Sequence, residues 1–184
     1  MRTVLGDIAA EEVGQVMFHE HILFDIVPPG ATGDRDRAIA PEDRWQIDYR
    51  SNDDPANAHQ TDPDIAAAEL RRYAEDGGDL IVDQSVHGLA RDPQGLAQAA
   101  RASGVHVVAA AGCYTARYVS TDVMQMDVDA LEARFTAEIT EGLDGTPIRA
   151  GLIGEIGCSW PLEPSERRAL QAAARAARAT GAAL

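Results

Sequence analysis

From residue 64 onwards the chain alternates between amphipathic helix patterns and short apolar strand patterns. Apolar spacing predicts helices over 64–75 and 92–102 and from about 127 and 164, and strands over 80–83, 105–110 and 150–154. The strand segments are nearly continuous apolar runs, which is typical of strands that are covered on both faces. Alternation of this kind predicts βαβ units and a parallel sheet, so the fold class is α/β.

Three of the predicted helices end at a glycine, at Gly77, Gly104 and Gly181. Glycine is favoured there because it adopts the left-handed backbone conformation that ends many helices. The first two are followed within two residues by a strand, and the third is followed by residues 182–184, which we expect to begin a fifth strand. A (β/α)8 barrel needs eight units and about 250 residues, so we expect a single incomplete domain over 1–184 with about four units.

The first core strand is predicted to end in a His-x-His motif, Phe18-His19-Glu20-His21. Segments 3–6 and 13–16 flank a polar turn, and we expect them to form a hairpin that leads into this strand. Alternation along a strand places His19 and His21 on one face, where both imidazoles can reach the same metal ion. The alternative is a pair of ordinary histidines at a strand end.

Other polar side chains follow the remaining predicted strands. Asp83 ends one strand and has His87 nearby, Tyr114 follows the next, and Glu155 follows the last. In a barrel these ends converge on one mouth, so Glu155 is a candidate ligand beside the two histidines of the first strand. The alternative for Glu155 is a carboxylate that faces solvent. His87 is predicted to contact substrate or to support the site.

The long segment 27–62 is rich in Pro, Gly, Asp and Asn and is predicted to be a loop over the pocket. Trp45 and Tyr49 could either pack it down or only anchor it. We expect His59 in this loop to be solvated, and His106, inside a strand, to be structural. Arg91-Asp92 is predicted to cap a helix, with Asp92 at its N-terminus.

The composition excludes several classes of function. Formal net charge is −14, which argues against nucleic acid and anionic membrane surfaces as partners. The sequence contains no lysine, so lysine chemistry, including a carbamylated lysine as a metal bridge, is excluded. Cys113 and Cys158 are expected to be small buried thiols without a disulfide. The chain has neither a signal-peptide pattern nor an apolar run of about 20 residues, so we expect a cytoplasmic protein.

Taken together, these motifs resemble the phosphotriesterase family of the amidohydrolase superfamily. The resemblance is carried by Thr3-Val4-Leu5-Gly6, the His-x-His motif, and segments 80–83, 90–92, 107–114 and 150–157. It covers nearly the whole chain and is weakest in the loop over 28–62. It implies a (β/α)8 barrel, of which this chain supplies the N-terminal half.

The resemblance also implies a metal centre with two divalent ions, usually zinc, with manganese, cobalt or iron as alternatives. His19 and His21 match the first-strand ligands, and Glu155 matches the bridging position, as in the glutamate-bridged phosphotriesterase homology proteins. Tyr114 matches an aromatic residue that lines the substrate pocket of lactonase-like members. The family's other ligands, on strands five, six and eight, and its proton-shuttle aspartate have no counterpart within these residues.

The implied activity is hydrolysis of an ester bond, in a lactone, a carboxylic ester or a phosphoric ester, by a metal-activated hydroxide. Two alternatives stay open. The chain could be a half barrel without catalysis of its own, which forms homo-oligomers or needs a complementing C-terminal half. It could also belong to a deaminase or amidase of the wider superfamily.

Overall fold

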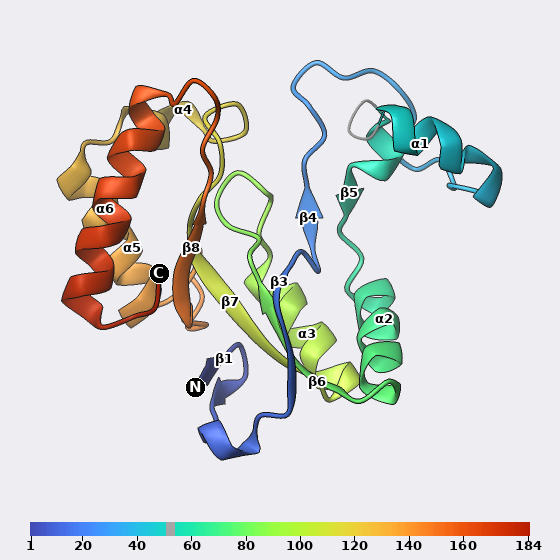
Figure 1. The fold of residues 1–184 in the computed structure, drawn as a ribbon, viewed down its shortest axis with the longest axis horizontal. Helices are drawn as coiled ribbons and strands as arrows, with labels where there is room; N and C mark the ends of the chain where they lie inside the picture. The colour runs from blue at the N-terminus through green and yellow to red at the C-terminus, as the bar shows by residue number, and fades with distance from the viewer. Residues whose placement is uncertain (51–53) are drawn as a thin grey trace.

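The centre of the molecule is a parallel sheet of four strands, in the order β3-β6-β7-β8 (Figure 1). The computed structural model describes residues 1–50 and 54–184. The sheet strands are β3 (Gln15–Glu20), β6 (Gly78–Asp83), β7 (His106–Cys113) and β8 (Leu152–Ile156). All three pairings are parallel, which confirms the predicted sheet.

Four longer helices alternate with these strands, as the apolar spacing predicted. They are α2 (Pro63–Glu75), α3 (Pro93–Ser103), α5 (Val128–Thr140) and α6 (Pro164–Thr180), with a short α4 (Thr121–Gln125) before α5. Aspartate side chains cap three of them by accepting backbone N–H groups of the first turn: Asp62, Asp92 and Asp127. The predicted cap at Asp92 is therefore confirmed. Gly104 and Gly181 end α3 and α6 in the left-handed conformation.

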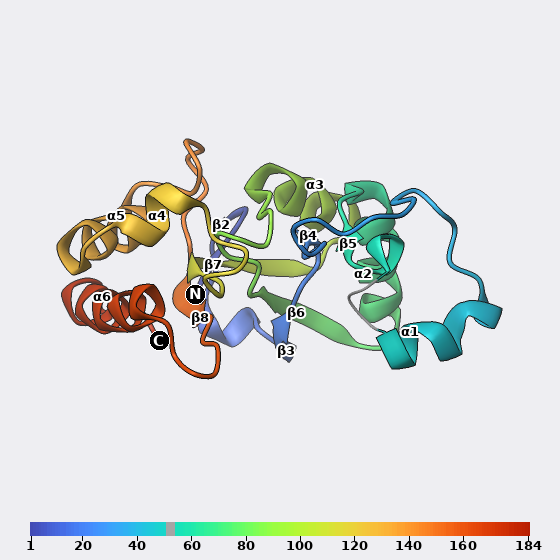
Figure 2. The ribbon, with the colours of Figure 1, turned by 90° about the horizontal axis from the view of Figure 1, so that it is seen from above.

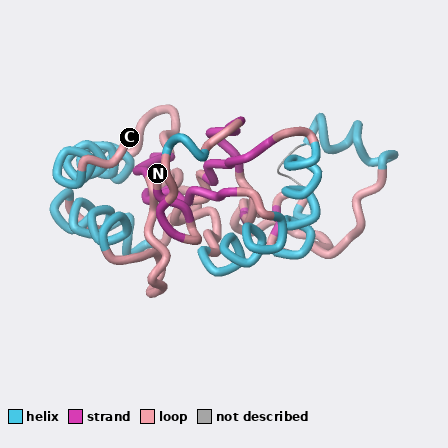
Figure 3. Tube along the Cα trace, turned by 90° about the horizontal axis from the view of Figure 1, so that it is seen from below, coloured by secondary structure: helices cyan, strands magenta, loops and turns pink. Residues whose placement is uncertain are grey.

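The helices flank the sheet in two pairs. Figure 2 shows α2 and α3 beside one part of the sheet and α5 and α6 beside the other, and Figure 3 shows the strands between them. The core is formed where helix and strand side chains meet, and its fully buried members include Leu96, Val107, Phe135 and Ile153. Burying each such side chain contributes about 1.5–3 kcal/mol, so these contacts hold the strand ends in fixed positions.

The N-terminal hairpin is shorter than predicted. β1 (Arg2–Thr3) pairs with β2 (Gly6–Asp7), while Gln15 and Val16 pair with β6 instead. Gly6 has φ +128°, which allows the tight turn, and the Gly14 amide donates to Asp79 at 2.8 Å, which directs segment 13–16 to the sheet. A 3-10 helix, η1 (Ala10–Glu12), connects the two parts.

The segment over 27–62 was predicted to be a loop over the pocket, and part of it is regular secondary structure. It contains η2 (Pro41–Asp43), α1 (Arg44–Arg50), η4 (Pro55–Asn57) and β5 (His59–Gln60), which pairs with β4 (Phe24–Asp25). Figures 1 and 2 show α1 at the opposite end of the molecule from α5 and α6. Trp45 is 63% exposed and Tyr49 87%, so neither packs the segment down.

Two further predictions about single residues are wrong. Cys158 is exposed rather than buried, because it follows β8 in the connection to α6, whereas Cys113 is buried at the end of β7. Both cysteines are free thiols, as predicted. His59 is not solvated, because its ring Nδ1 lies 2.9 Å from the Pro55 carbonyl oxygen and the side chain is half-buried.

The sheet has one open apolar edge at β3. Val16 and Met17 are exposed there, and Phe18 is 76% exposed. At the other edge Ala183 forms a parallel bridge with Leu152, in agreement with the fifth strand expected after Gly181. Within the described residues, the helices are too short or too polar to cross a lipid bilayer.

Candidate metal centre

The first part of the site lies at the end of β3. The register between β3 and β6 shifts between Met17 and Glu20, so His19 lies in an irregular part of the strand and His21 directly after it. Such irregularities re-aim side chains at strand ends. The two imidazole rings lie 5.6 Å apart and nearly perpendicular, so the predicted pair does share one face.

Glu155 of β8 lies opposite both histidines. Its Oε2 is 3.6 Å from Nε2 of His19, and its Oε1 is 3.8 Å from Nε2 of His21. These distances are too long for hydrogen bonds, and Oε1 is buried without a hydrogen-bond partner. One ligand atom from each of the three residues lies within 4.8 Å of the others.

These observations fit a divalent cation. A buried carboxylate oxygen without a partner is costly, and a cation between it and two imidazoles would remove that cost. Zinc binds His nitrogen and carboxylate oxygen at about 2.0–2.2 Å, which suits donor atoms 3.6–3.8 Å apart around a shared centre. The alternative of a solvent-facing Glu155 is not what the geometry shows.

Two glycines allow the ends of β7 and β8 to lie close together, and this close contact places Glu155. A Cβ at Gly112 of β7 would lie 2.6 Å from the Glu155 carbonyl oxygen. A Cβ at Gly157 would lie 2.2 Å from the Thr115 amide nitrogen. Any side chain at either position would therefore push the ends of β7 and β8 apart.

Buried polar groups orient His21. Asp83 accepts hydrogen bonds from the amides of Ile22 at 2.7 Å and Ser85 at 2.8 Å. The Ser85 hydroxyl lies 3.2 Å from Nδ1 of His21, which leaves Nε2 directed at Glu155. Sequence analysis identified Asp83 only as a strand end. The serine two residues later, Ser85, is the signal that could have indicated hydrogen bonds supporting His21.

Burial shifts the pKa values of Glu155 and His21 in the directions that favour their neutral forms. Burial raises the pKa of Glu155, and the charge of His19 opposes the shift. Burial, and secondarily His19, lowers the pKa of His21. Neutral imidazole is the form that binds metals, so the environment keeps His21 in its ligand form near neutral pH.

The predicted substrate residues lie on the next two connections. Tyr114 is half-buried directly after β7, and burial together with the charge of Glu155 raises its pKa. His87 has both ring nitrogens engaged, with Nε2 2.9 Å from the Ser120 hydroxyl and Nδ1 3.1 Å from an Arg134 nitrogen. A direct substrate contact by either residue stays a prediction.

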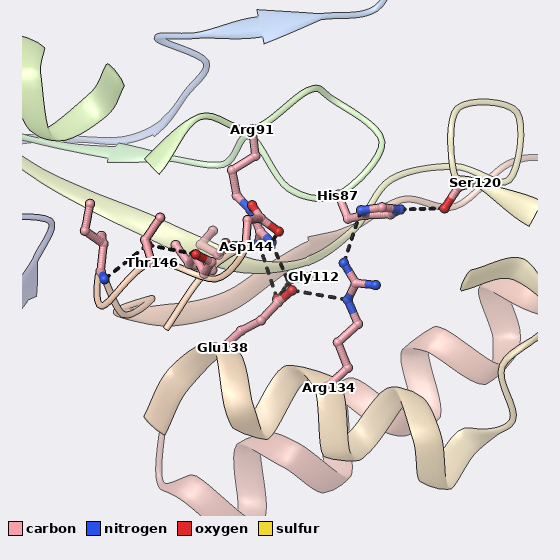
Figure 4. Close-up of polar contacts among 11 residues, drawn as sticks. His87, Arg91, Gly112, Ser120, Arg134, Glu138, Asp144 and Thr146 are labelled. Atoms are coloured by element: carbon pink, nitrogen blue, oxygen red, sulfur yellow. Dashed lines mark hydrogen bonds and ion pairs between the residues drawn. The ribbon is translucent and has the colours of Figure 1, made fainter. Parts of the chain in front are cut away.

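Sequence analysis missed a buried ion-pair network around Arg91 (Figure 4). Arg91 bonds Glu138 at 2.9 Å and Asp144 at 2.8 Å, and the Arg91 and Glu138 side chains are only 1% and 6% exposed. Arg134 bonds Glu138 from one turn away on α5. Because the partners of Arg91 lie far along the chain, only the Arg134–Glu138 spacing on one helix was visible in the sequence.

Curated relatives cover nearly the whole chain. It is 37% identical over 185 residues to N-acetyltaurine hydrolase of Salmo salar and 34% identical over 183 residues to that of Homo sapiens; each match covers 96% of this chain and 52% of the relative. It is also 31% identical to a phosphotriesterase-related protein of Nematostella vectensis, of which it covers 55%. The chain therefore spans about half the length of the curated relatives it matches.

Solved structures show the same fold. A resiniferatoxin-binding protein from Rhodobacter sphaeroides superposes with a TM-score of 0.90 at 33% identity, over 98% of this chain and 52% of that protein. The phosphotriesterase homology protein of Escherichia coli gives a TM-score of 0.73 at 24% identity, over 93% and 51%. The expected barrel fold, represented by four strands and their helices, is thus confirmed.

The family model of the phosphotriesterase family matches residues 1–184. This match includes all the motifs that end the strands, from the His-x-His pair to Glu155. The chain belongs to the phosphotriesterase family.

Proposed function

We propose that this chain supplies part of the active site of a metal-dependent hydrolase. The observation that carries the proposal is the cluster of His19, His21 and Glu155, with the buried Oε1 of Glu155 left without a hydrogen-bond partner. Two imidazoles and a carboxylate are the ligand set of many hydrolytic zinc sites. Zinc is the proposed ion, and manganese, cobalt and iron accept the same ligands.

In the proposed mechanism each residue has a separate task. A bound divalent ion supplies a Lewis acid that acidifies water and polarises the oxygen of the bond under attack. His19 and His21 would hold the ion, and Glu155 would supply a negative charge that balances it. Asp83 fixes the turn after β3, and Ser85 fixes the His21 ring, so the ligands need little reorganisation.

Zinc titration tests the metal site without any assay of activity. We expect zinc to bind the wild-type chain, and Glu155→Gln or His21→Ala to weaken the affinity by at least about 10-fold, since even the loss of an outer-sphere partner typically costs 10–100-fold. His106→Ala is the matched control, because His106 is a half-buried histidine at the other end of β7. Unchanged zinc affinity in both site variants would refute the proposal.

We propose an ester bond, in a lactone, carboxylic ester or phosphoric ester, as the bond that is broken. Tyr114 supports this assignment, because it matches the aromatic pocket residue of lactonase-like members and the charge of Glu155 contributes to its raised pKa. A second candidate is an amide bond, because the curated relatives named above include N-acetyltaurine hydrolases. Ester and amide carbonyls demand the same activation, so the metal ligands do not separate the two.

A substrate panel separates these candidates. The protein from its own source is assayed with zinc against a lactone, an aryl acetate, a phosphotriester and N-acetyltaurine. Ester hydrolysis that is lost with a chelator and in the Glu155→Gln variant supports the first candidate, and hydrolysis of N-acetyltaurine alone supports the second. Hydrolysis that survives chelation would contradict both.

We further propose that the active site needs additional strands beyond the four described. Strand β3 is an open edge of the sheet that another strand would cover, and it exposes the apolar residues Val16, Met17 and Phe18. A complementing C-terminal half or a second copy of the chain would supply it. Sedimentation of the 184-residue chain is expected to show association, and an active monomer of these residues alone would contradict this proposal.

A further inference from the structure

Besides the metal cluster, a second set of polar contacts lies close to the candidate site. It runs from the ion pairs of Arg91 through Glu138 and Arg134 of α5 to His87, and from there to Ser120 (Figure 4). Its buried part is fixed to the middle of β7, because Arg91 donates to the Ala110 carbonyl at 3.1 Å. The outer part ends on the segment that follows Tyr114.

His87 is also bound to the end of β7 through its backbone. Its amide donates to the Gly112 carbonyl at 3.3 Å, and its carbonyl accepts the Tyr114 amide at 2.8 Å. Its side chain then spans the gap between Arg134 on α5 and Ser120. One residue thus connects β7, α5 and the segment over 115–120.

The segment over 115–120 lies against the strand end that presents Glu155. A Cβ at Gly157 would meet the Thr115 amide and the Tyr114 carbonyl carbon, at 2.2 and 2.4 Å. The Gly157 amide donates to the Cys113 carbonyl at 2.9 Å. A displacement of segment 115–120 would therefore move Tyr114 relative to Glu155.

We propose that His87 is a positioning residue, whose neutral imidazole fastens segment 115–120 to α5 and so fixes Tyr114 beside the metal cluster. The effect on the active site rests on the proposed function. The two side-chain contacts of His87, with Arg134 and Ser120, form a clamp that can be observed without any metal or substrate. This positioning role is an alternative to a direct substrate contact by His87, because both ring nitrogens already have a partner.

The partners dictate the tautomer. Arg134 can only donate, so Nδ1 of His87 must be the unprotonated acceptor, and Nε2 then carries the hydrogen and donates to the Ser120 hydroxyl. The charged groups around the ring are Arg134 and Glu138 on α5, Arg91, Asp144 and, on α4, Asp122. A proton on Nδ1 would face the Arg134 guanidinium and break the clamp.

Nitrogen NMR of the imidazoles tests the proposal directly in the wild-type protein. We expect the His87 signals of a neutral ring with hydrogen on Nε2 at pH 7. A neutral ring with hydrogen on Nδ1, or a cationic ring at that pH, would overturn the proposal, whatever the metal site does.

Amide hydrogen exchange tests the consequence. The amides of Tyr118 and Val119 both donate to the Thr115 carbonyl, so they report on segment 115–120. We expect His87→Phe to speed their exchange about five- to tenfold, the equivalent of one or two lost hydrogen bonds. His87→Gln, whose amide can still reach Ser120, should recover part of the protection.

Controls separate the clamp from general loosening and from the metal site. His106→Phe alters a different half-buried histidine, at the start of β7, and should leave the exchange of Tyr118 and Val119 unchanged. Glu155→Gln should do the same while weakening zinc binding by at least about 10-fold. Equal exchange in wild type and His87→Phe, or equal acceleration by His87→Phe and His106→Phe, would refute the positioning role.

Discussion

The molecule holds two clusters of ionisable groups at one end of its sheet, and they differ in how completely their polar atoms are satisfied. In the ion-pair network around Arg91, every carboxylate oxygen of Glu138 and Asp144 accepts a hydrogen bond. In the cluster around Glu155, the shortest contacts are 3.6 and 3.8 Å, and one buried oxygen has no partner. The first arrangement is complete without a ligand, and in the second the proposed metal ion would supply the missing partner.

The contrast separates a charge that the fold itself satisfies from one that the proposed metal ion would satisfy. Burial alone is not the criterion, because Glu138 is more buried than Glu155. What differs is that folding itself supplies the counter-charge for Glu138, whereas Glu155 meets two imidazoles that carry no fixed charge. Removing a charge should therefore destabilise the first cluster and leave the unliganded second cluster nearly unchanged.

The largest effect is expected for Arg91→Met. It leaves Glu138 and Asp144 without their main counter-charge, and breaking a buried pair in this way costs about 3–5 kcal/mol of the free energy of unfolding. Urea unfolding measures it. Arg72→Met, at an exposed pair with Glu69, is the control and should cost under about 0.5 kcal/mol.

Should Arg91→Met not fold, Arg91→Lys provides the measurement, because it keeps the charge but loses the paired geometry. We expect Arg91→Lys to be less stable than both the wild type and the Arg72→Met control. An Arg91→Lys protein as stable as wild type would mean that the network contributes little, and the contrast with Glu155 would fail.

The second effect concerns the metal cluster. Zinc at 100 times its dissociation constant should stabilise the wild-type chain by about 2.7 kcal/mol, and the Glu155→Gln variant by far less. Without zinc the same substitution should change stability by less than about 1 kcal/mol, because no hydrogen bond of Oε1 is lost. Thermal unfolding with and without zinc gives both numbers, and a large loss in the absence of metal would contradict the comparison.

The residues behind these effects differ in how far their positions and roles could be predicted from the sequence. The strands and helices were predictable because apolar periodicity and glycine stops are local signals. His19, His21 and Glu155 were predictable as strand-end residues because parallel strands bring their ends together. The register of the hairpin could not be predicted, since it depends on the backbone conformation of Gly6 and on the hydrogen bond between Gly14 and Asp79. Nor could the sequence show that Arg91 is buried against Glu138 and Asp144.

A third effect is a pH dependence of stability that has opposite signs at two carboxylates. Burial raises the pKa of Asp83 to about 6, although the amides of Ile22 and Ser85 oppose the shift. The folded protein then holds a proton that the unfolded chain releases, so stability falls as pH rises from 3.8 to about 6, by at most about 1.4 kcal/mol per pH unit.

Asp144 has the opposite sign. Burial alone would raise its pKa, but the hydrogen bonds and charge of Arg91 outweigh burial and lower it. Its contribution to stability is present above 3.8 and is lost as pH falls through the lowered value. Asp83→Asn and Asp144→Asn, unfolded in urea at several pH values, should therefore remove slopes of opposite sign. Slopes of the same sign would show that Arg91 does not outweigh burial at Asp144.

The smallest effect on stability is expected for an exposed ion pair on the helix surface. Arg175 of α6 bonds Asp129 of α5 at 2.8 Å, a length equal to that of the Arg91–Asp144 pair, yet both side chains are well exposed. Solvent and salt screen such a pair, so Arg175→Ala should cost about 0–1 kcal/mol and less still at high salt. Urea unfolding at low and high salt measures this. A cost as large as that of Arg91→Met would mean that pair geometry, and not burial with complete hydrogen bonding, sets the value of a charge in this fold.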